Sequence, residues 1–269
     1  MIVHNFDPVL VDFGFFQVRW YSLAYILGIT IGWLYALKII KFTKNSSINF
    51  ETVQAEDFDK LIIYLVVGII FGGRLGYVIF YNQEYYIYNF IEIFKIWHGG
   101  MSFHGGLLGV IVATLIYSKK IKINFFKFTD IIACVAPIGI FLGRLANFIN
   151  GELYGKVSNA PWAVIFLKAG NVGRHPSQIY EALLEGALLF ILINYFALKK
   201  KLLFRVGFIS GFFLIFYSLF RIFAEIFREP DLHVGYLFNY FSLGTLLSFI
   251  TLIVGLIIVF NIKKNEQNN

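Results

Sequence analysis

The chain has 269 residues, of which 58% are hydrophobic and only 14% are charged, and its formal net charge is +7. Soluble globular domains carry about 25% charged residues, so this composition excludes an ordinary soluble domain and indicates a protein that crosses the membrane several times. The modest positive charge does not imply nucleic acid as a partner, because cytoplasmic loops of membrane proteins are rich in Lys and Arg.

Seven stretches of the chain are apolar and long enough to span a bilayer, which takes about 20 mostly apolar residues. They cover residues 20–40, 60–81, 100–118, 129–149, 177–198, 207–227 and 238–261. The sequence therefore predicts an all-α polytopic membrane protein with about seven transmembrane helices, forming a single integral-membrane domain over residues 1–269. The N-terminal segment lacks the basic region of a cleaved signal peptide, so the first span is expected to remain as an anchor.

Two connections between the predicted spans differ in composition from the rest. Residues 82–98 are aromatic and mixed in polarity, which is too broken for a span and favours a segment that lies in the membrane interface. Residues 150–176 are polar and contain Gly and Pro, which predicts a small head outside the membrane. Within that head, PWAVIF (161–166) is expected to form a short strand.

The distribution of Lys and Arg predicts the orientation of the spans. One set of loops and span ends holds 14 of the 23 basic residues. These are Lys38, Lys41, Lys44, Lys60, Lys119, Lys120, Lys122, Lys127, Lys199, Lys200, Lys201, Arg205, Lys263 and Lys264. This side is expected to be cytoplasmic and to include the C-terminus. Seven spans then place the N-terminus, the 83–98 segment and the head on the outer side.

Polar side chains inside the predicted spans are candidates for function, because charges in a membrane are costly and usually mark a site. Arg74 lies in GGRLGYVIFYN, whose glycines leave the helix thin enough for a neighbouring helix or a ligand to approach. His104 lies in GGMSFHGGLLGV. A neutral histidine can act as a base near pH 7, and the glycines on both sides are expected to leave room for a substrate. The alternative for His104 is a hydrogen-bonded packing group.

The stretch GRLANFINGELYG, residues 143–155, gathers polar groups at the end of an apolar helix. Arg144 and Asn147 are three residues apart and share a helix face, and Glu152 follows Gly151, where the helix is expected to end. The structural alternatives are an arginine that reaches toward water and asparagines that bond locally.

The fifth and sixth spans carry two further charged faces. Glu181 and Glu185 are four residues apart in RHPSQIYEALLEG, so their carboxylates share one face, with Glu185 the deeper. The sixth span carries a continuous stripe made of Tyr217, Arg221, Glu225 and Arg228. Ion pairs between these groups are the structural alternative to a ligand site.

These polar groups gather in the outer half of the membrane, where basic groups outnumber acidic ones when His104 is counted. Arginines bind phosphate bidentately, so a phosphodiester headgroup entering from the lipid is the natural ligand. The sequence contains no zincin motif, P-loop or GxSxG motif, and its single cysteine, Cys134, excludes a cysteine-based metal site. No metal or cofactor is expected. Two other classes stay open: a transporter with an outward-facing Arg/Glu cavity, and a non-catalytic lipid-binding protein.

The quoted stretches, together with FRIFAEIFREPD (220–231), resemble in their order the blocks of the bacterial phosphatidylglycerol–prolipoprotein diacylglyceryl transferases. The resemblance runs from about Trp20 to the last span. It implies a multi-pass enzyme of the bacterial cytoplasmic membrane with seven spans and an extracytoplasmic N-terminus. It also implies the reaction, in which a diacylglyceryl group passes from phosphatidylglycerol to the lipobox cysteine thiol of a prolipoprotein signal peptide. A thioether forms and glycerol phosphate leaves.

Residue by residue, the resemblance implies that Arg144 binds the phosphate of phosphatidylglycerol and that His104 and Arg221 are catalytic. It adds Asn147, Glu152 and Tyr21 as positions of importance. Arg74 is expected to contact substrate, and the supporting residues are expected to be Glu225, Arg228, Glu181 and Tyr217. Glu152, Glu181 and Glu225 are predicted to hold the arginines in place. One departure from the family pattern is Arg19, which occupies a position where relatives tend to have a histidine. The head is also shorter than in larger relatives, so contacts made by the heads of those relatives are not transferred to this chain.

Overall fold

The computed structural model describes residues 2–48, 52–80, 82–96, 99–230, 236–237 and 241–267. The chain divides into two compact units. Unit 1 comprises Met1–Lys38 and Asp130–Asn269, and unit 2 comprises Ile39–Thr129. Each unit is described by itself.

Six helices among the described residues are long and apolar enough to cross a membrane. They are α1 (Trp20–Lys44), α2 (Ala55–Phe80), α5 (Phe125–Asn150), the helix Ser177–Lys199, α8 (Phe208–Glu225) and α9 (Leu243–Gln267). They confirm an all-α polytopic membrane protein and six of the predicted spans. The remaining stretch, 100–118, corresponds to α4 (Phe103–Ile121), which is not among the six, so a count of seven stays a prediction.

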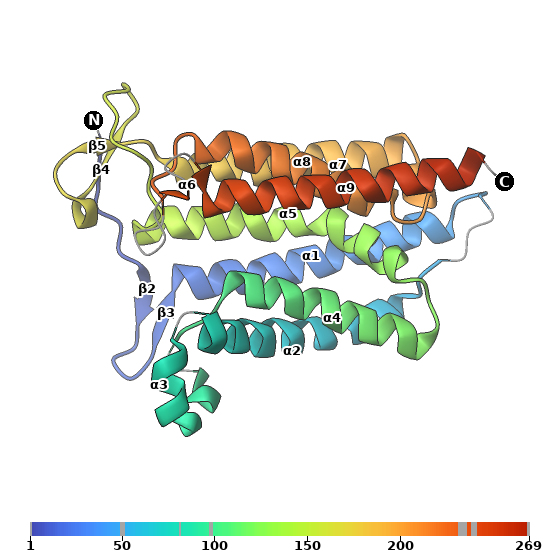
Figure 1. Ribbon diagram of the computed structural model, residues 1–269, viewed down its shortest axis with the longest axis horizontal. Helices are drawn as coiled ribbons and strands as arrows, with labels where there is room; N and C mark the ends of the chain where they lie inside the picture. Colours follow the sequence, from blue (N-terminus) through green and yellow to red (C-terminus); the bar gives the residue numbers. More distant parts are fainter. Residues whose placement is uncertain are drawn as a thin grey trace. The chain divides into compact units, whose positions relative to one another are not determined.

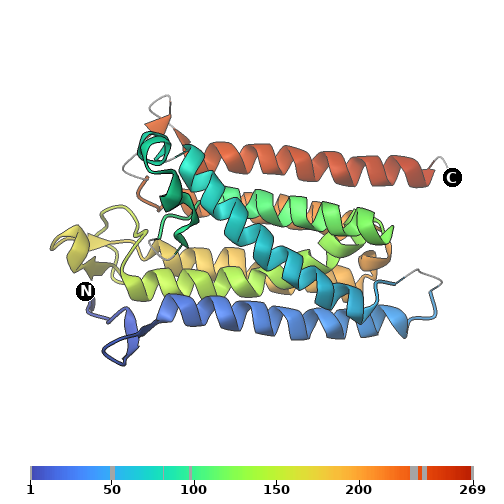
Figure 2. The ribbon, with the colours of Figure 1, turned by 90° about the horizontal axis from the view of Figure 1, so that it is seen from below.

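In unit 2, α2 and α4 lie side by side (Figures 1 and 2) and their glycines form the contact. A Cβ atom on Gly72 would lie 2.9 Å from the Cα of Gly109, and one on Gly76 would lie 2.8 Å from the Cα of Gly105. Such small-residue seams let two membrane helices approach closely. The expectation of open space beside His104 is therefore wrong for Gly105, which is covered by the backbone of α2.

The segment after α2 consists of two short helices, α3 (Gln83–Tyr88) and η1 (Phe90–Phe94). Neither is long enough to span a bilayer, as the sequence predicts. Their exposed apolar side chains are Tyr85, Ile87, Tyr88, Phe90, Ile91 and Phe94. A surface of this kind suits the headgroup boundary of a membrane.

In unit 1, a buried carboxylate on α5 fixes the start of α8. Asp130 accepts hydrogen bonds from the backbone N–H groups of Gly207, at 2.6 Å, and of Ser210, at 2.7 Å. The first turn of a helix has N–H groups without partners inside the helix, so this carboxylate caps α8 from a neighbouring helix. The contact ties α5, which carries Arg144, to α8, which carries Arg221. Beyond α8, α9 runs along it in both ribbon views.

The helix Ser177–Lys199 is wound unevenly. It begins as α6 (Ser177–Glu181), widens into a π-helical stretch (Ala182–Leu188), narrows into α7 (Leu189–Asn194) and widens again (Tyr195–Lys199). Single π-helical turns are common at functional sites. Gly186, in the first wide stretch, contacts α5 so closely that an added Cβ would lie 2.8 Å from the Cα of Phe141. This approach brings the helix that carries two glutamates against the helix that carries Arg144.

A small three-stranded sheet forms part of the head. The N-terminal strand β1 (Ile2–His4) pairs in parallel with β4 (Val164–Phe166), which pairs antiparallel with β5 (Gly173–Arg174). Strand β4 confirms the strand predicted within 161–166. The contribution of β1, and the hairpin of β2 (Val9–Asp12) and β3 (Gln17–Arg19), were not predicted. The remaining short elements are η3 (Leu167–Ala169), η6 (Leu202–Phe204), β6 (Tyr236–Leu237) and β7 (Phe241–Ser242).

Candidate functional site

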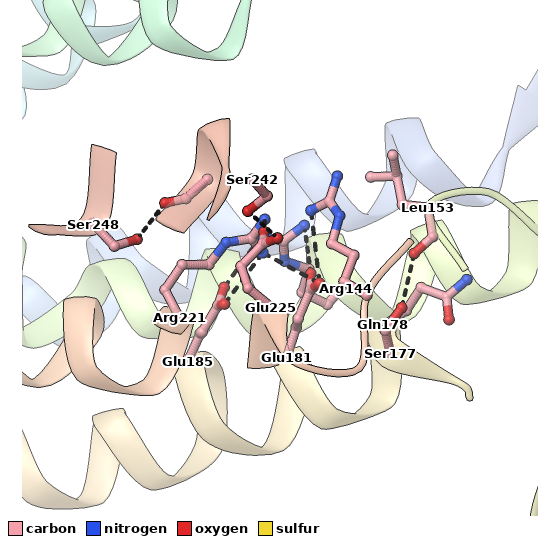
Figure 3. Close-up of polar contacts among 12 residues, drawn as sticks. Arg144, Leu153, Ser177, Gln178, Glu181, Glu185, Arg221, Glu225, Ser242 and Ser248 are labelled. Carbon is pink, nitrogen blue, oxygen red and sulfur yellow. Dashed lines mark hydrogen bonds and ion pairs between the residues drawn. The ribbon is translucent and has the colours of Figure 1, made fainter. Parts of the chain in front are cut away.

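Three arginines and three glutamates meet at one place in unit 1, where α5, the helix Ser177–Lys199 and the end of α8 converge (Figure 3). We call this group the Arg–Glu cluster. It consists of Arg144, Glu181, Glu185, Arg221, Glu225 and Arg228.

Glu181 contacts all three arginines of the cluster. Its carboxylate oxygens lie 2.8 Å from Nη1 of Arg144, 3.2 Å from Nη1 of Arg221 and 3.6 Å from Nη1 of Arg228. The side chain of Glu181 has no exposed surface. A fully buried carboxylate is stable only when cations or hydrogen-bond donors surround it, so these contacts account for its position.

Glu185 lies one turn deeper and bridges two of the same arginines. It accepts a hydrogen bond from Nη2 of Arg144 at 3.1 Å and another from Nη1 of Arg221 at 3.3 Å. The spacing of four residues therefore places both carboxylates on the arginine side of their helix, as the sequence predicts. Because Glu185 touches the same arginines as Glu181, it belongs to the site, and the i, i+4 pattern was the signal that could have placed it there.

Glu225 connects the cluster to the start of α9. Its carboxylate forms an ion pair with Nη2 of Arg221 and accepts a hydrogen bond from Ser242 Oγ at 2.8 Å. Ser242 Oγ in turn accepts from the backbone N–H of Thr245 at 3.1 Å. Gly244 leaves space for the carboxylate, because a Cβ there would lie 2.5 Å from Glu225 Oε1. The role of Ser242 had no signal in the sequence.

The turn after α5 holds the other polar residues of the 143–155 stretch. The Asn147 side chain donates to Glu152 Oε1 at 2.8 Å, and that of Asn150 donates to the same oxygen at 3.3 Å. The first residues of α6 hold the turn, since Gln178 Nε2 donates to the carbonyl of Glu152 at 2.6 Å. Of the three carboxylates predicted to hold the arginines, Glu181 and Glu225 do so, whereas Glu152 bonds these asparagines instead.

Gly155, the last residue of that stretch, lies between two backbone segments. A Cβ atom there would be 2.5 Å from the carbonyl oxygens of both His175 and Phe227. The Gly155 N–H donates to His175 at 2.9 Å, and the next N–H, of Lys156, donates to Phe227 at 2.9 Å. A glycine is needed here because the head is bonded directly to the end of α8, one residue before Arg228.

The cluster is balanced in charge and differs in exposure from one arginine to the next. The side chain of Arg144 is 17% exposed, against 11% for Arg221 and 8% for Arg228, while the carboxylates of Glu181 and Glu185 are fully covered. Arg144 is therefore the most exposed of the three arginines. Guanidinium groups already fixed by carboxylates lose little freedom on binding, and their planar forks suit an anion with paired oxygens such as phosphate.

Two predicted tyrosines lie in unit 1, Tyr21 on α1 and Tyr217 on α8. Tyr21 is in the first turn of α1, and its ring lies 5.1 Å from that of Tyr25. Tyr217 is one turn before Arg221 on α8 and stacks on Phe213 with ring centroids 5.8 Å apart. Arg19, the departure from the family pattern, ends strand β3, where it pairs with Val9.

His104 lies in unit 2, in the first turn of α4, and its side chain is exposed. Ser102 caps this helix by accepting from the N–H of Gly105 at 3.2 Å, and its own N–H donates to the carbonyl of Gly73 at 2.8 Å. The structure thus fixes the turn that carries His104 to α2. It brings together the predicted residues of the Arg–Glu cluster within unit 1, whereas His104 and Arg74 both belong to unit 2.

Arg74 is buried, and its guanidinium donates to five backbone carbonyls. Three of these acceptors are the carbonyl oxygens of Ile93 at 2.8 Å, Gly100 at 3.2 Å and Lys95 at 3.2 Å. The other two, shorter contacts are with the carbonyls of Glu92 and Gly99. The guanidinium thus fastens the segment between α3 and α4 to α2, and carbonyl oxygens take the place of the anionic partner that a buried arginine requires.

No group of three or more His, Cys, Asp or Glu side chains placed to hold a metal ion occurs within the described ranges. The arrangement instead offers fixed cationic donors for an anion.

The chain was compared with known proteins. The family model of prolipoprotein diacylglyceryl transferase matches residues 8–261. The phosphatidylglycerol–prolipoprotein diacylglyceryl transferase of Rickettsia felis is 49% identical over 255 residues, which cover 95% of this chain and 96% of the relative. The protein of the same name from Rickettsia akari is 50% identical over 255 residues, with the same coverage. The one from Rickettsia bellii is 47% identical over 260 residues, which cover 96% of each chain.

Replacing Arg74 by Lys is expected to loosen residues 89–96 while α2 remains folded, because one ammonium group cannot donate to five carbonyls. Hydrogen bonds from a charged group contribute about 1.5–3 kcal/mol each, so amide hydrogen exchange in this segment should accelerate at least about tenfold. Arg205→Lys, which changes an exposed arginine paired with Glu266, is the matched control and should leave the segment unchanged. Exchange rates in Arg74→Lys equal to those of the unaltered chain would contradict this role.

Proposed function

The chain belongs to the prolipoprotein diacylglyceryl transferase family, and from this premise we propose how its residues carry out the transfer. It is a multi-pass membrane enzyme of lipoprotein biosynthesis that transfers a diacylglyceryl group from phosphatidylglycerol to a prolipoprotein. Nothing in the comparisons favours the transporter that the sequence left open. The acceptor in this proposal is the thiol of the lipobox cysteine in the signal peptide, and the product is a thioether.

The observation that carries the proposal is the Arg–Glu cluster. Arg144 and Arg221 share the carboxylates of Glu181 and Glu185, which hold the two guanidinium groups close together in a largely buried place. The phosphate of phosphatidylglycerol would bind these arginines, with Arg144 as the more exposed contact. The family resemblance assigns the phosphate to the same arginine.

The reaction asks the site to stabilise charge on a leaving phosphate. The thiol sulfur attacks the glycerol carbon that bears the phosphate ester, the new C–S bond forms, and the C–O bond breaks with its electron pair remaining on the phosphate oxygen. Arg144 and Arg221 donate to the charge that develops there. Fixed donors in a site of low dielectric constant are effective at this, because they need no reorganisation when the charge appears.

The thiol must also lose its proton, since a free cysteine thiol has a pKa near 8.5 and the thiolate is the nucleophile. We propose that His104 is the base that accepts the thiol proton. Its exposed side chain lies on a turn that is fixed by the hydrogen bond between Ser102 and Gly73. Asn147, Glu152 and Tyr21 would contact substrate, while Glu225, Arg228 and Tyr217 would support the arginines. Arg74 would act on the substrate site through the segment that it fastens.

The charge distribution supports an orientation with the C-terminus in the cytoplasm and the head outside. A fluorescent reporter that matures only in the cytoplasm should fluoresce when fused after residue 269 and stay dark when fused before residue 1. The reverse pattern would contradict this orientation.

Arg144→Ala is expected to abolish thioether formation while the protein remains inserted. Removing one donor of developing charge lowers the rate by about 10²–10³, and Arg144 also binds the lipid, so the loss should reach at least this range. The assay uses vesicles of phosphatidylglycerol with a lipobox peptide, and Arg205→Ala, at the opposite end of α8, is the matched control. Full transferase activity in Arg144→Ala would contradict the proposal. Solute flux across the vesicle membrane without thioether formation would favour the transporter instead.

His104→Gln should lower the rate by about 10²–10⁴ at neutral pH, the usual contribution of a general base, while leaving the affinity for phosphatidylglycerol unchanged. The defect should shrink as the pH rises toward the thiol pKa, because the thiolate then forms without the base. The measurement is the pH profile of the single-turnover rate for the variant and the unaltered enzyme. If the single-turnover rates of His104→Gln and of the unaltered enzyme are equal at every pH, His104 is excluded as the base.

A further inference from the structure

Arg228 differs from the other members of the Arg–Glu cluster because it lies outside a helix. Helix α8 ends at Glu225, and Arg228 follows after a turn. Its Nη1 lies 3.6 Å from a carboxylate oxygen of Glu181, and its side chain is only 8% exposed. Since no helix carries Arg228, another part of unit 1 has to hold it at the cluster.

The head holds the backbone on both sides of Arg228. Gly155 and Arg228 face each other in an antiparallel bridge. The two backbone hydrogen bonds of this bridge join the Lys156 N–H to the Phe227 carbonyl at 2.9 Å and the Glu229 N–H to the Tyr154 carbonyl at 3.4 Å. The position of Arg228 therefore depends on where the head lies.

The side chain of Arg174 links the two paired segments. Its Nη1 donates to the Gly155 carbonyl at 3.2 Å and to Glu229 Oε2 at 3.1 Å, so one nitrogen contacts both segments. The guanidinium also lies over the ring of Tyr154, 4.9 Å from the ring centroid. Its Nε is buried without a hydrogen-bond partner in the described part of the chain, a cost that the contacts of Nη1 have to offset.

Arg174 has a fixed backbone of its own. It lies in strand β5, where it pairs with Val164 of β4, and it faces Val157 in a second antiparallel bridge. Side chains at a functional site keep their geometry when the residues that support them are themselves held by packing and hydrogen bonds. The sheet of the head provides such a support, and Arg174 connects it to the segment that carries Arg228.

We propose that Arg174 is a positioning residue, which acts through Glu229 and the paired backbone to hold Arg228 against Glu181. The inference rests on the proposed function, in which Arg228 supports the arginines that bind phosphate. Without Arg228 in place, the buried carboxylate of Glu181 keeps two cations, Arg144 and Arg221, and it then competes more strongly with the lipid phosphate for them.

Arg174→Gln removes both contacts of Nη1 and is expected to lower kcat/KM for thioether formation about 10–100-fold, because a misplacement of about 1 Å in a supporting group can cost about 10² in rate. Arg174→Lys keeps one cationic nitrogen, which can serve both acceptors, and should retain most of the activity. The assay uses vesicles of phosphatidylglycerol with a lipobox peptide. Arg205→Gln breaks the exposed pair with Glu266 and is the matched control, which should be fully active. Full activity in Arg174→Gln would overturn the inference.

The double variant Arg174→Gln/Arg228→Ala separates positioning from a general structural effect. If Arg174 acts through Arg228, the double variant should be as active as Arg228→Ala alone, whereas independent effects would multiply. A double variant that is weaker than Arg228→Ala by the whole factor seen for Arg174→Gln would overturn the inference. Should Arg174→Gln fail to fold, Glu229→Gln removes the other side of the same contact and replaces it in both comparisons.

Arg228→Ala alone distinguishes the two proposals. Full activity in this variant would contradict the supporting role of Arg228 in the proposed function, and the inference with it. A loss of activity in Arg228→Ala that multiplies with that of Arg174→Gln would contradict only the role of Arg174.

Discussion

The burial of Glu181 among three arginines is the constraint around which unit 1 is arranged. A carboxylate with no exposed surface needs its cations in place, and these cations come from α5, from α8 and from the residue three positions after α8. The other contacts make that meeting possible. Gly186 lets the glutamate helix approach α5, Asp130 fixes the start of α8, and Ser242 holds Glu225 at the far side of Arg221. Losing one member would leave a buried charge unpaired, which is strongly destabilising.

The same arrangement suits the chemistry of the family. Arginines fixed by carboxylates are prepared for a phosphate. The polar end of α5 is held in place by contacts from other segments. Gln178 bonds the turn after α5, and Gly155 lets the head bond to the backbone just after α8. Arg221 is linked to Arg144 through the glutamates that both contact. In unit 2, Arg74 and Ser102 give the turn with His104 a fixed connection to α2.

Hydropathy and spacing predicted the elements well because both report on which face of a helix is apolar. They located six spanning helices, the strand β4 and the faces that carry Glu181, Glu185 and Arg221. They did not reveal which residues contact one another across helices, since a polar face of one helix can pack against any of several others. Glu152 was expected beside an arginine and bonds Asn147 and Asn150, because the turn after α5 brings these side chains together. Gly105 was expected beside open space and packs on α2. The strand β1 was missed because its partner β4 lies more than 150 residues along the chain.

A structure of the full chain with short-chain phosphatidylglycerol in nanodiscs tests the central claim most directly. We expect phosphate density within hydrogen-bonding distance of the Arg144 and Arg221 guanidinium groups. Phosphate density at another place, with all ion pairs of the Arg–Glu cluster unchanged, would contradict the claim that these arginines bind the lipid.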